Sequence, residues 1–160
     1  MPPIISVVGK SGSGKTTLIE KLIPEMKKRG YRIAIIKHAF HQFDIDKEGK
    51  DSWRHRAAGA DTVIVASHGR IAMVKNHNSE NIDNMEAYFS DMDIVITEGY
   101  KRENKPKIEV FRSAAHKEPL CLGNNDLIAL VTDTDVDLNV PRFGLEDIQK
   151  LADFIEKKYL

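Results

Sequence analysis

Three scarcities in this 160-residue sequence each exclude a class of protein. Cys121 is the single cysteine, so no disulfide can form within the chain and a reducing compartment is expected. Lys and Arg together number 24, and Asp and Glu also number 24, so no excess of positive charge favours nucleic acid as the main partner. No apolar run approaches the roughly 20 residues that a membrane-spanning helix needs. The sequence therefore predicts a protein with no disulfide framework, no nucleic-acid partner and no membrane partner.

The start of the sequence also lacks the basic and then apolar segment of a secretory leader. Together with the low cysteine content, this favours a cytoplasmic protein. Hydrophobic residues make up 41% of the chain and charged residues 30%, as in ordinary soluble proteins. The length suits one hydrophobic core, and we find no repeat, low-complexity tract or linker. A single domain over residues 1–160 is therefore expected, and the glycine-rich loop near its start makes it a nucleotide-binding domain.

A glycine-rich loop near the start fits the phosphate-binding pattern G-x-x-x-x-G-K-[ST] at every fixed position. The mostly β-branched run Ile4–Val8 predicts a buried strand before the loop, and apolar residues at helical spacing predict a helix after it. Strand, loop and helix are the context that this motif requires. The predicted nucleotide-binding residues are Gly9, Lys10, Ser11, Gly12, Ser13, Gly14, Lys15, Thr16 and Thr17.

Each part of this phosphate-binding loop (P-loop) has a chemical reason. Glycines let the backbone come close to a ligand, and consecutive N–H groups at a helix N-terminus favour an anionic phosphate. Lys15 is the predicted catalytic cation on the outer phosphates, and the Thr16 hydroxyl is a predicted Mg²⁺ ligand. For Lys10 a solvated side chain is the simpler interpretation, and a contact across a dimer interface is the alternative.

The rest of the chain alternates buried strands with helices, which predicts an α/β fold. We expect a P-loop NTPase-type, mainly parallel sheet flanked by helices, with an added β-hairpin. The predicted strands are Tyr31–Ile36, Asp93–Thr97, a half-buried Lys107–Arg112 and Leu127–Val131, and the hairpin pairs Thr62–Ala66 with Arg70–Val74. The predicted helices are Lys15–Arg29, Asp51–Ala58 with Asp51 or Ser52 as its cap, a modest Glu80–Phe89, and a closing helix from Leu145 to Ile155.

Ligands of an open α/β sheet lie outside the carboxyl ends of its strands, and this rule selects further candidates. Glu98 directly follows the predicted strand Asp93–Thr97, so it is the first candidate for catalysis and for Mg²⁺, directly or through a bound group. Asp93 begins the same strand and should lie far from the phosphates. Asp46 and Asp44 are the alternative magnesium carboxylates, although Asp is also common in loops that bind nothing.

Asp133 follows the Leu127–Val131 strand and is the predicted base-reading residue. A carboxylate accepts hydrogen bonds from guanine N1–H and N2–H₂, and adenine offers no such pair of donors. An ordinary turn over residues 132–135 is an equally good interpretation. The residues alone therefore favour GTP over ATP only moderately.

A charged stretch with two histidines follows the second strand. His38, His41, Asp44 and Asp46 have the nitrogen and oxygen atoms of a transition-metal site, but their spacing is not a strong metal signature. Arg54 and Arg56 lie in the same stretch, and its basic residues could instead hold an anionic substrate.

These segments resemble the MobB family, the molybdopterin-guanine dinucleotide biosynthesis adapter proteins. The resemblance covers most of the chain to about Asp133, and its most specific part is Asp44–Ala60, within the matching segment Phe43–Ala60. The other matching segments are Gly9–Leu18, Lys37–His38, Asp93–Lys101 and Lys107–Val110.

The resemblance implies a homodimeric GTP-binding adapter with weak GTPase activity that uses Mg²⁺. It implies two partners, a MobA-like molybdopterin nucleotidyltransferase and molybdopterin, the organic part of the molybdenum cofactor. With this resemblance, a pterin phosphate bound through Arg54 and Arg56 is preferred to a metal at His38, His41, Asp44 and Asp46. Two alternatives of different class are a small-molecule kinase or ATP-dependent ligase with its acceptor in the Lys37–Arg56 loop, and a metal-delivery GTPase using His38 and His41.

Overall fold

A computed structural model describes residues 1–39 and 43–160, and these form two compact units. The first unit comprises Met1–His38 and Met85–Leu160, and the second comprises Ala39–Asn84. The single domain expected over 1–160 stays a prediction. Within the described residues, no helix is long and apolar enough to cross a membrane.

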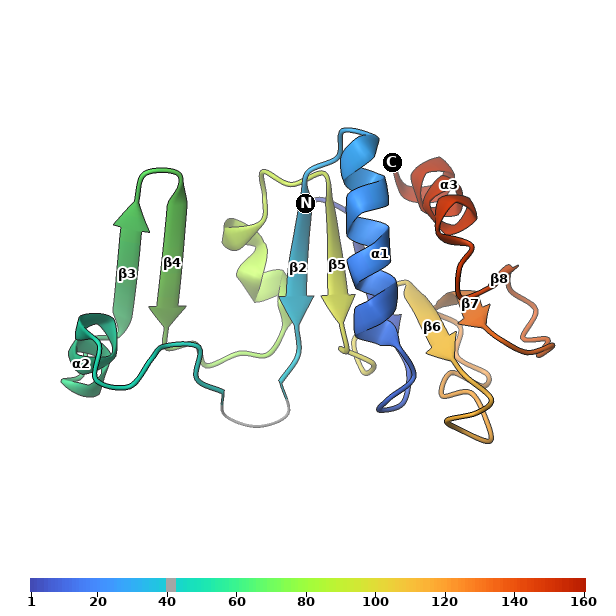
Figure 1. Cartoon of the computed structure of the whole chain (residues 1–160), viewed down its shortest axis with the longest axis horizontal. Helices are drawn as coiled ribbons and strands as arrows, with labels where there is room; N and C mark the ends of the chain where they lie inside the picture. Colours follow the sequence, from blue (N-terminus) through green and yellow to red (C-terminus); the bar gives the residue numbers. More distant parts are fainter. Residues whose placement is uncertain (40–42) are drawn as a thin grey trace. The chain divides into compact units, whose positions relative to one another are not determined.

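The first unit is built on a parallel six-stranded sheet of order β2-β5-β1-β6-β7-β8 (Figure 1). This confirms the predicted mainly parallel α/β sheet and places the P-loop strand, β1, in its interior. The short β8 was not predicted, because two residues are too few to show a periodic pattern. The strands are β1 (Ile4–Val8), β2 (Ile33–Lys37), β5 (Ile94–Glu98), β6 (Lys107–Phe111), β7 (Leu127–Thr132) and β8 (Arg142–Phe143).

Helices α1 (Lys15–Lys28) and α3 (Ile148–Tyr159) pack on the same face of this sheet (Figure 1). Alternate residues of each strand point toward them, because side chains of a strand alternate between its two faces. The core between sheet and helices is wholly apolar, with members such as Ile5, Leu22 and Ile155. Burial of this apolar surface is the main term that holds the P-loop between strand and helix.

Strand β6 differs from its prediction. The alternation of polar and apolar residues suggested a half-buried strand, whereas every residue of β6 is buried. The two polar residues have partners inside the protein. The Lys107 ammonium donates to the Glu103 carbonyl at 2.6 Å and to the Asp126 carboxylate at 3.0 Å, and the Glu109 carboxylate accepts two backbone N–H bonds. Charged residues that are buried with partners alternate with apolar residues in the sequence just as exposed ones do, so β6 has the pattern of a strand with one face in water.

The second unit contains α2 (Asp51–Ala57) and a separate two-stranded antiparallel sheet of β3 (Thr62–Ser67) and β4 (Arg70–Lys75). The hairpin is therefore confirmed, as a sheet of its own. The predicted cap of α2 is wrong, because Lys50 is the N-cap and makes no side-chain cap bond. The Ser52 hydroxyl instead donates to Asp46 at 2.9 Å.

The helix predicted over Glu80–Phe89 is a 3-10 helix, η1 (Ile82–Tyr88), which runs from the second unit into the first. The tighter winding of a 3-10 helix suits a short connection. The local sequence pattern does not distinguish a short 3-10 helix from a short α-helix.

Candidate nucleotide site

The P-loop joins β1 to α1, and its last glycine is the N-cap of the helix. Gly14 has a φ of 98°, a left-handed conformation that favours glycine, and α1 begins at Lys15. The Lys15 ammonium turns back over the loop and donates to the carbonyls of Gly9 at 3.0 Å and Lys10 at 2.9 Å. The Lys15 ammonium therefore lies against the loop backbone, where a bound phosphate would meet it.

Gly9 lies closer to the sheet than any other residue type would allow. A Cβ on Gly9 would stand 2.5 Å from the Val110 carbonyl oxygen of β6 and 2.6 Å from the Ser13 hydroxyl. Its φ of 150° is also a conformation that other residues rarely adopt. The P-loop thus packs directly against the neighbouring strand, as its first glycine permits.

Three charged or polar side chains gather on the β5 side of the P-loop. The Thr16 hydroxyl donates to Glu98 Oε1 at 2.8 Å, and Lys37 Nζ lies 3.7 Å from Glu98 Oε2. The parallel register pairs Lys37 with Glu98 at the ends of β2 and β5, which brings them together. Desolvation lowers the pKa of Lys15, with Glu98 opposing that shift and Lys37 adding to it. A hydroxyl and a carboxylate in contact beside a phosphate-binding loop are a donor set that suits Mg²⁺.

Asp93 lies at the other end of β5, as its sequence position predicts. Its carboxylate forms hydrogen bonds with the Arg32 guanidinium and backbone N–H, and these lower the pKa of Asp93 to about 2. Asp93 therefore holds the amino ends of two strands together and takes no part in the phosphate site.

Asp133 lies at the carboxyl end of β7, where the sequence places it. Its Oδ1 accepts the Ser113 N–H at 2.9 Å, and this bond lowers the pKa of the Asp133 carboxyl. The structure thus shows Asp133 fastening the segment that follows β6, a role that was not predicted.

Lys10 also has a partner that the sequence did not indicate. Its ammonium donates to the Glu118 carbonyl oxygen at 2.8 Å, so the solvated interpretation of Lys10 is incomplete. A second bond lies close by, because the His116 ring nitrogen Nε2 is 2.7 Å from the Ser11 carbonyl oxygen. Residues 116 and 118 therefore fasten the segment after β6 to the P-loop.

Arg112 is the charged residue at this edge that the sequence analysis missed. The strand was predicted to include Arg112, but β6 ends at Phe111, so Arg112 is the first residue beyond its carboxyl end. The rule that selected Glu98 and Asp133 applies to it equally. Its Cδ atom lies 3.8 Å from the position that a Cβ on Gly14 would occupy.

The histidine and aspartate candidates do not form a metal site among the residues that the structure describes. His38 is the last residue of the first segment of the first unit, and its ring lies 4.8 Å from the Tyr100 ring. Its backbone N–H donates to the Glu98 carbonyl. His41 lies outside the described residues. Asp44 and Asp46 belong to the second unit, where Asp44 Oδ2 accepts from Arg56 at 2.6 Å.

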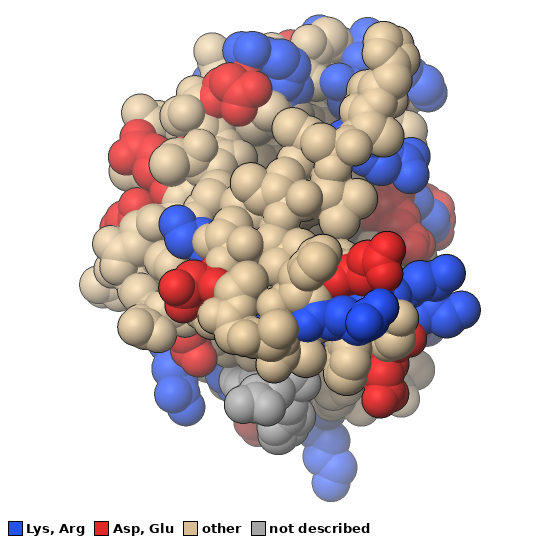
Figure 2. All heavy atoms as spheres, turned by 90° about the vertical axis from the view of Figure 1, so that its left-hand side faces the viewer, with Lys and Arg blue, Asp and Glu red and all other residues tan. Residues whose placement is uncertain are grey.

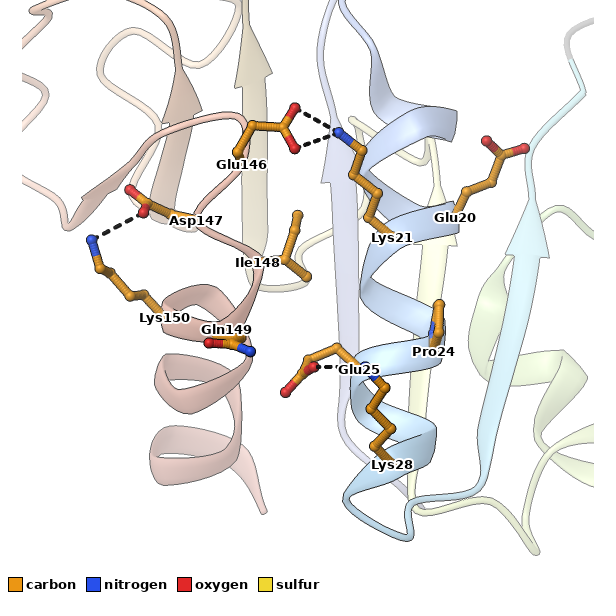
Figure 3. Close-up of a pocket in the computed structure, with 10 residues that line it drawn as sticks. All are labelled: Glu20, Lys21, Pro24, Glu25, Lys28, Glu146, Asp147, Ile148, Gln149 and Lys150. Atoms are coloured by element: carbon orange, nitrogen blue, oxygen red, sulfur yellow. Dashed lines mark hydrogen bonds and ion pairs between the residues drawn. The ribbon is translucent and has the colours of Figure 1, made fainter.

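A hollow of about 560 Å³ lies between the outer side of α1 and the start of α3 (Figure 3). Ion pairs engage much of its charged lining. Lys21 donates to both oxygens of Glu146, at 2.6 and 2.7 Å, and Lys150 donates to Asp147 at 2.9 Å. The Lys21–Glu146 pair joins α1 to the residues before α3, whereas the Lys150–Asp147 pair lies at the N-terminus of α3.

Comparison with known proteins agrees with this geometry. Residues 4–133 match a family model described as MobB, molybdopterin guanine dinucleotide synthesis protein B. A molybdopterin-guanine dinucleotide biosynthesis adapter protein of Haemophilus influenzae is 40% identical over 157 residues, which cover 96% of this chain and 88% of the relative. The Escherichia coli (strain K12) protein of that name is 39% identical over 163 residues, covering 97% and 92%.

Two solved structures show the same fold. A crystal structure of molybdopterin-guanine biosynthesis protein B has a TM-score of 0.79 and 32% identity, with 96% of this chain and 98% of that chain covered. The crystal structure of Bacillus subtilis MobB has a TM-score of 0.80 and 26% identity, covering 99% and 98%.

Proposed function

The chain belongs to the MobB family of molybdopterin guanine dinucleotide synthesis proteins, and we propose that it is a cytoplasmic GTP-binding adapter of that biosynthesis. In this proposal it assists a nucleotidyltransferase that joins a guanine nucleotide to molybdopterin. The observation that supports nucleotide binding is the P-loop, with Lys15 against its backbone and Thr16 in contact with Glu98.

Mg²⁺ is the second expected ligand of this site. Thr16 and Glu98 would hold the ion, which would neutralise charge on the outer phosphates. Asp46 lies in the second unit and remains an alternative ligand. Slow hydrolysis is expected, because the described residues around Glu98 include no evident side chain that would orient an attacking water.

GTP is expected to bind more tightly than ATP in the presence of Mg²⁺, and Asp133 is the proposed reader of the base. Asp133→Ala should lower the affinity for GTP about ten-fold and the affinity for ATP much less, since only guanine offers two donors to a carboxylate. Isothermal titration calorimetry of the wild type and the variant measures the change in affinity for GTP and for ATP.

The same experiment distinguishes direct recognition of the base by Asp133 from a purely structural role of this residue. Equal losses for GTP and ATP would show that Asp133 acts only through its bond to Ser113. Equal or ATP-favoured binding by the wild type would contradict the adapter proposal and favour the kinase or ligase alternative.

The second unit is the proposed contact for molybdopterin. Arg56 is already paired with Asp44, whereas the Arg54 side chain is 72% exposed. Within residues 1–39 and 43–160, one ion pair engages the Arg54 guanidinium, to Asp51 at 3.8 Å. Arg54→Ala should therefore weaken binding of the pterin phosphate about five-fold and leave GTP affinity unchanged. Fluorescence titration with molybdopterin, in the presence of the nucleotidyltransferase, measures both pterin binding and assembly; unchanged pterin affinity would exclude Arg54.

The β3–β4 hairpin is the proposed interface of a homodimer. The apolar side chains of Ile64, Val65, Ile71 and Met73 are exposed, with Ile71 exposed to 73%. Uncharged side chains, drawn in tan, cover much of the face in Figure 2. Among the described residues each strand of this two-stranded sheet pairs only with the other, so each also has an open edge. An isolated hairpin is marginal in water, and a second copy would cover both the apolar side chains and an edge.

A further inference from the structure

The P-loop has two chemically different sides. Lys15 and Thr16 would face the outer phosphates, and Glu98 lies on the β5 side of the P-loop strand. The sheet order β2-β5-β1-β6-β7 puts the ends of β6 and β7 on the opposite side of β1. A nucleotide with its outer phosphates toward Glu98 therefore extends its nucleoside across the loops that follow β6 and β7.

The segment that follows β6 is fastened along its whole length. At its start, Asp133 accepts the Ser113 N–H, and at its end the buried Glu109 carboxylate accepts the N–H groups of Leu120 and Cys121, the latter at 2.8 Å. The pairs His116–Ser11 and Lys10–Glu118 hold its middle to the P-loop. Residues 112–120, which we call the nucleoside wall, thus have a defined position beside the phosphate site.

Arg112 is the first residue of the nucleoside wall and lies nearest to the P-loop helix. Its Cδ atom lies 3.8 Å from the position that a Cβ on Gly14 would occupy, which is van der Waals distance. Arg112 is exposed, and no hydrogen bond or ion pair engages its guanidinium among the residues described. After the Ser113 N–H bond, the charge of Arg112 also contributes to lowering the pKa of the Asp133 carboxyl. A planar cation is therefore available at the place where the nucleoside would lie.

We propose that Arg112 is a nucleotide-binding residue whose guanidinium stacks on the purine ring of bound GTP, with the nucleoside wall holding it in position. This inference rests on the proposed function, because it assumes a nucleotide on the P-loop. Arginine is suited to this role, since its planar, weakly hydrated guanidinium stacks on aromatic faces and a lysine ammonium does not. Arg112 supplies the ring contact, and Asp133 supplies hydrogen-bond acceptors at the edge of the ring.

The test compares GTP with inorganic tripolyphosphate, which has the phosphates but no nucleoside. Isothermal titration calorimetry with Mg²⁺ at physiological salt should show that Arg112→Ala lowers GTP affinity about ten-fold, as expected for loss of one base stack. Tripolyphosphate affinity should fall by less than about three-fold, because only a screened charge is lost. Arg112→Lys should retain tripolyphosphate affinity and still lose about five-fold in GTP affinity.

Arg32→Ala is the matched control, because Arg32 lies before β2 at the opposite edge of the sheet, paired with Asp93. It should leave both affinities unchanged. Unchanged GTP affinity in a folded Arg112→Ala protein would overturn the stacking role, and so would equal losses for GTP and tripolyphosphate, which would make Arg112 a phosphate contact. A wild type that binds neither ligand would overturn the proposed function as well, so the two failures are distinguishable. Thermal unfolding of each variant reports whether it is folded.

Discussion

Lys15→Ala is expected to lower the affinity for GTP at least about 100-fold. The Lys15 ammonium spans two loop carbonyls at 2.9 and 3.0 Å, so it is positioned for two charge-assisted bonds to phosphate oxygens. Bonds of this kind contribute about 1.5 kcal/mol or more each, and two of them correspond to roughly 100-fold in affinity. Isothermal titration calorimetry with GTP and with tripolyphosphate should show the loss for both ligands, since in this proposal Lys15 would contact the phosphates that the two ligands share.

Lys21→Ala is the control for this variant. Lys21 lies on the same helix and carries the same charge, but its ammonium is engaged by Glu146 beside the hollow of Figure 3. It should bind GTP like the wild type. A Lys15→Ala protein that keeps GTP affinity within about three-fold would contradict phosphate binding by this loop.

Ile71→Glu is expected to convert a dimeric wild type into a monomer. Ile71 is the most exposed apolar residue of the hairpin, and a carboxylate there would have to be desolvated in an interface between two copies. The cost of burying two unpaired charges, one from each copy, is several kcal/mol and exceeds what a small interface supplies. Sedimentation velocity at matched protein concentrations measures the change in mass.

Leu122→Glu provides the comparison, because Leu122 is 55% exposed and lies in the first unit, outside the hairpin. This variant should remain dimeric. A monomeric wild type, or a dimer that survives Ile71→Glu, would show that the hairpin is not the interface.

The fold could be predicted closely where local pattern and tertiary environment agree. Strand β1 and helix α1 match their predictions within one residue, because a fixed glycine motif separates a β-branched run from a helical repeat. Strand β6 shows the limit. Its polar residues Lys107 and Glu109 are buried with partners that are distant in sequence, and periodicity cannot distinguish them from a solvated face.

The candidate site was predictable to a similar extent. The pairing of Thr16 with Glu98 follows from the rule that parallel strands end at one edge, and the structure brings the two side chains to 2.8 Å. The contact between Lys10 and Glu118 could not be predicted, because it depends on the path of an irregular segment. Arg112 was missed for a simpler reason, a strand boundary placed one residue too far.

The nucleoside wall has a thermodynamic consequence. Its residues are held by Asp133, Glu109 and two contacts to the P-loop, so the conformational entropy of ordering them is lost when the protein folds. A nucleotide that binds beside it need not order the segment again, and more of the contact energy is then available as affinity. Loosening the wall at a distance from the ligand, for instance at Glu109, would transfer that entropic cost to the binding step.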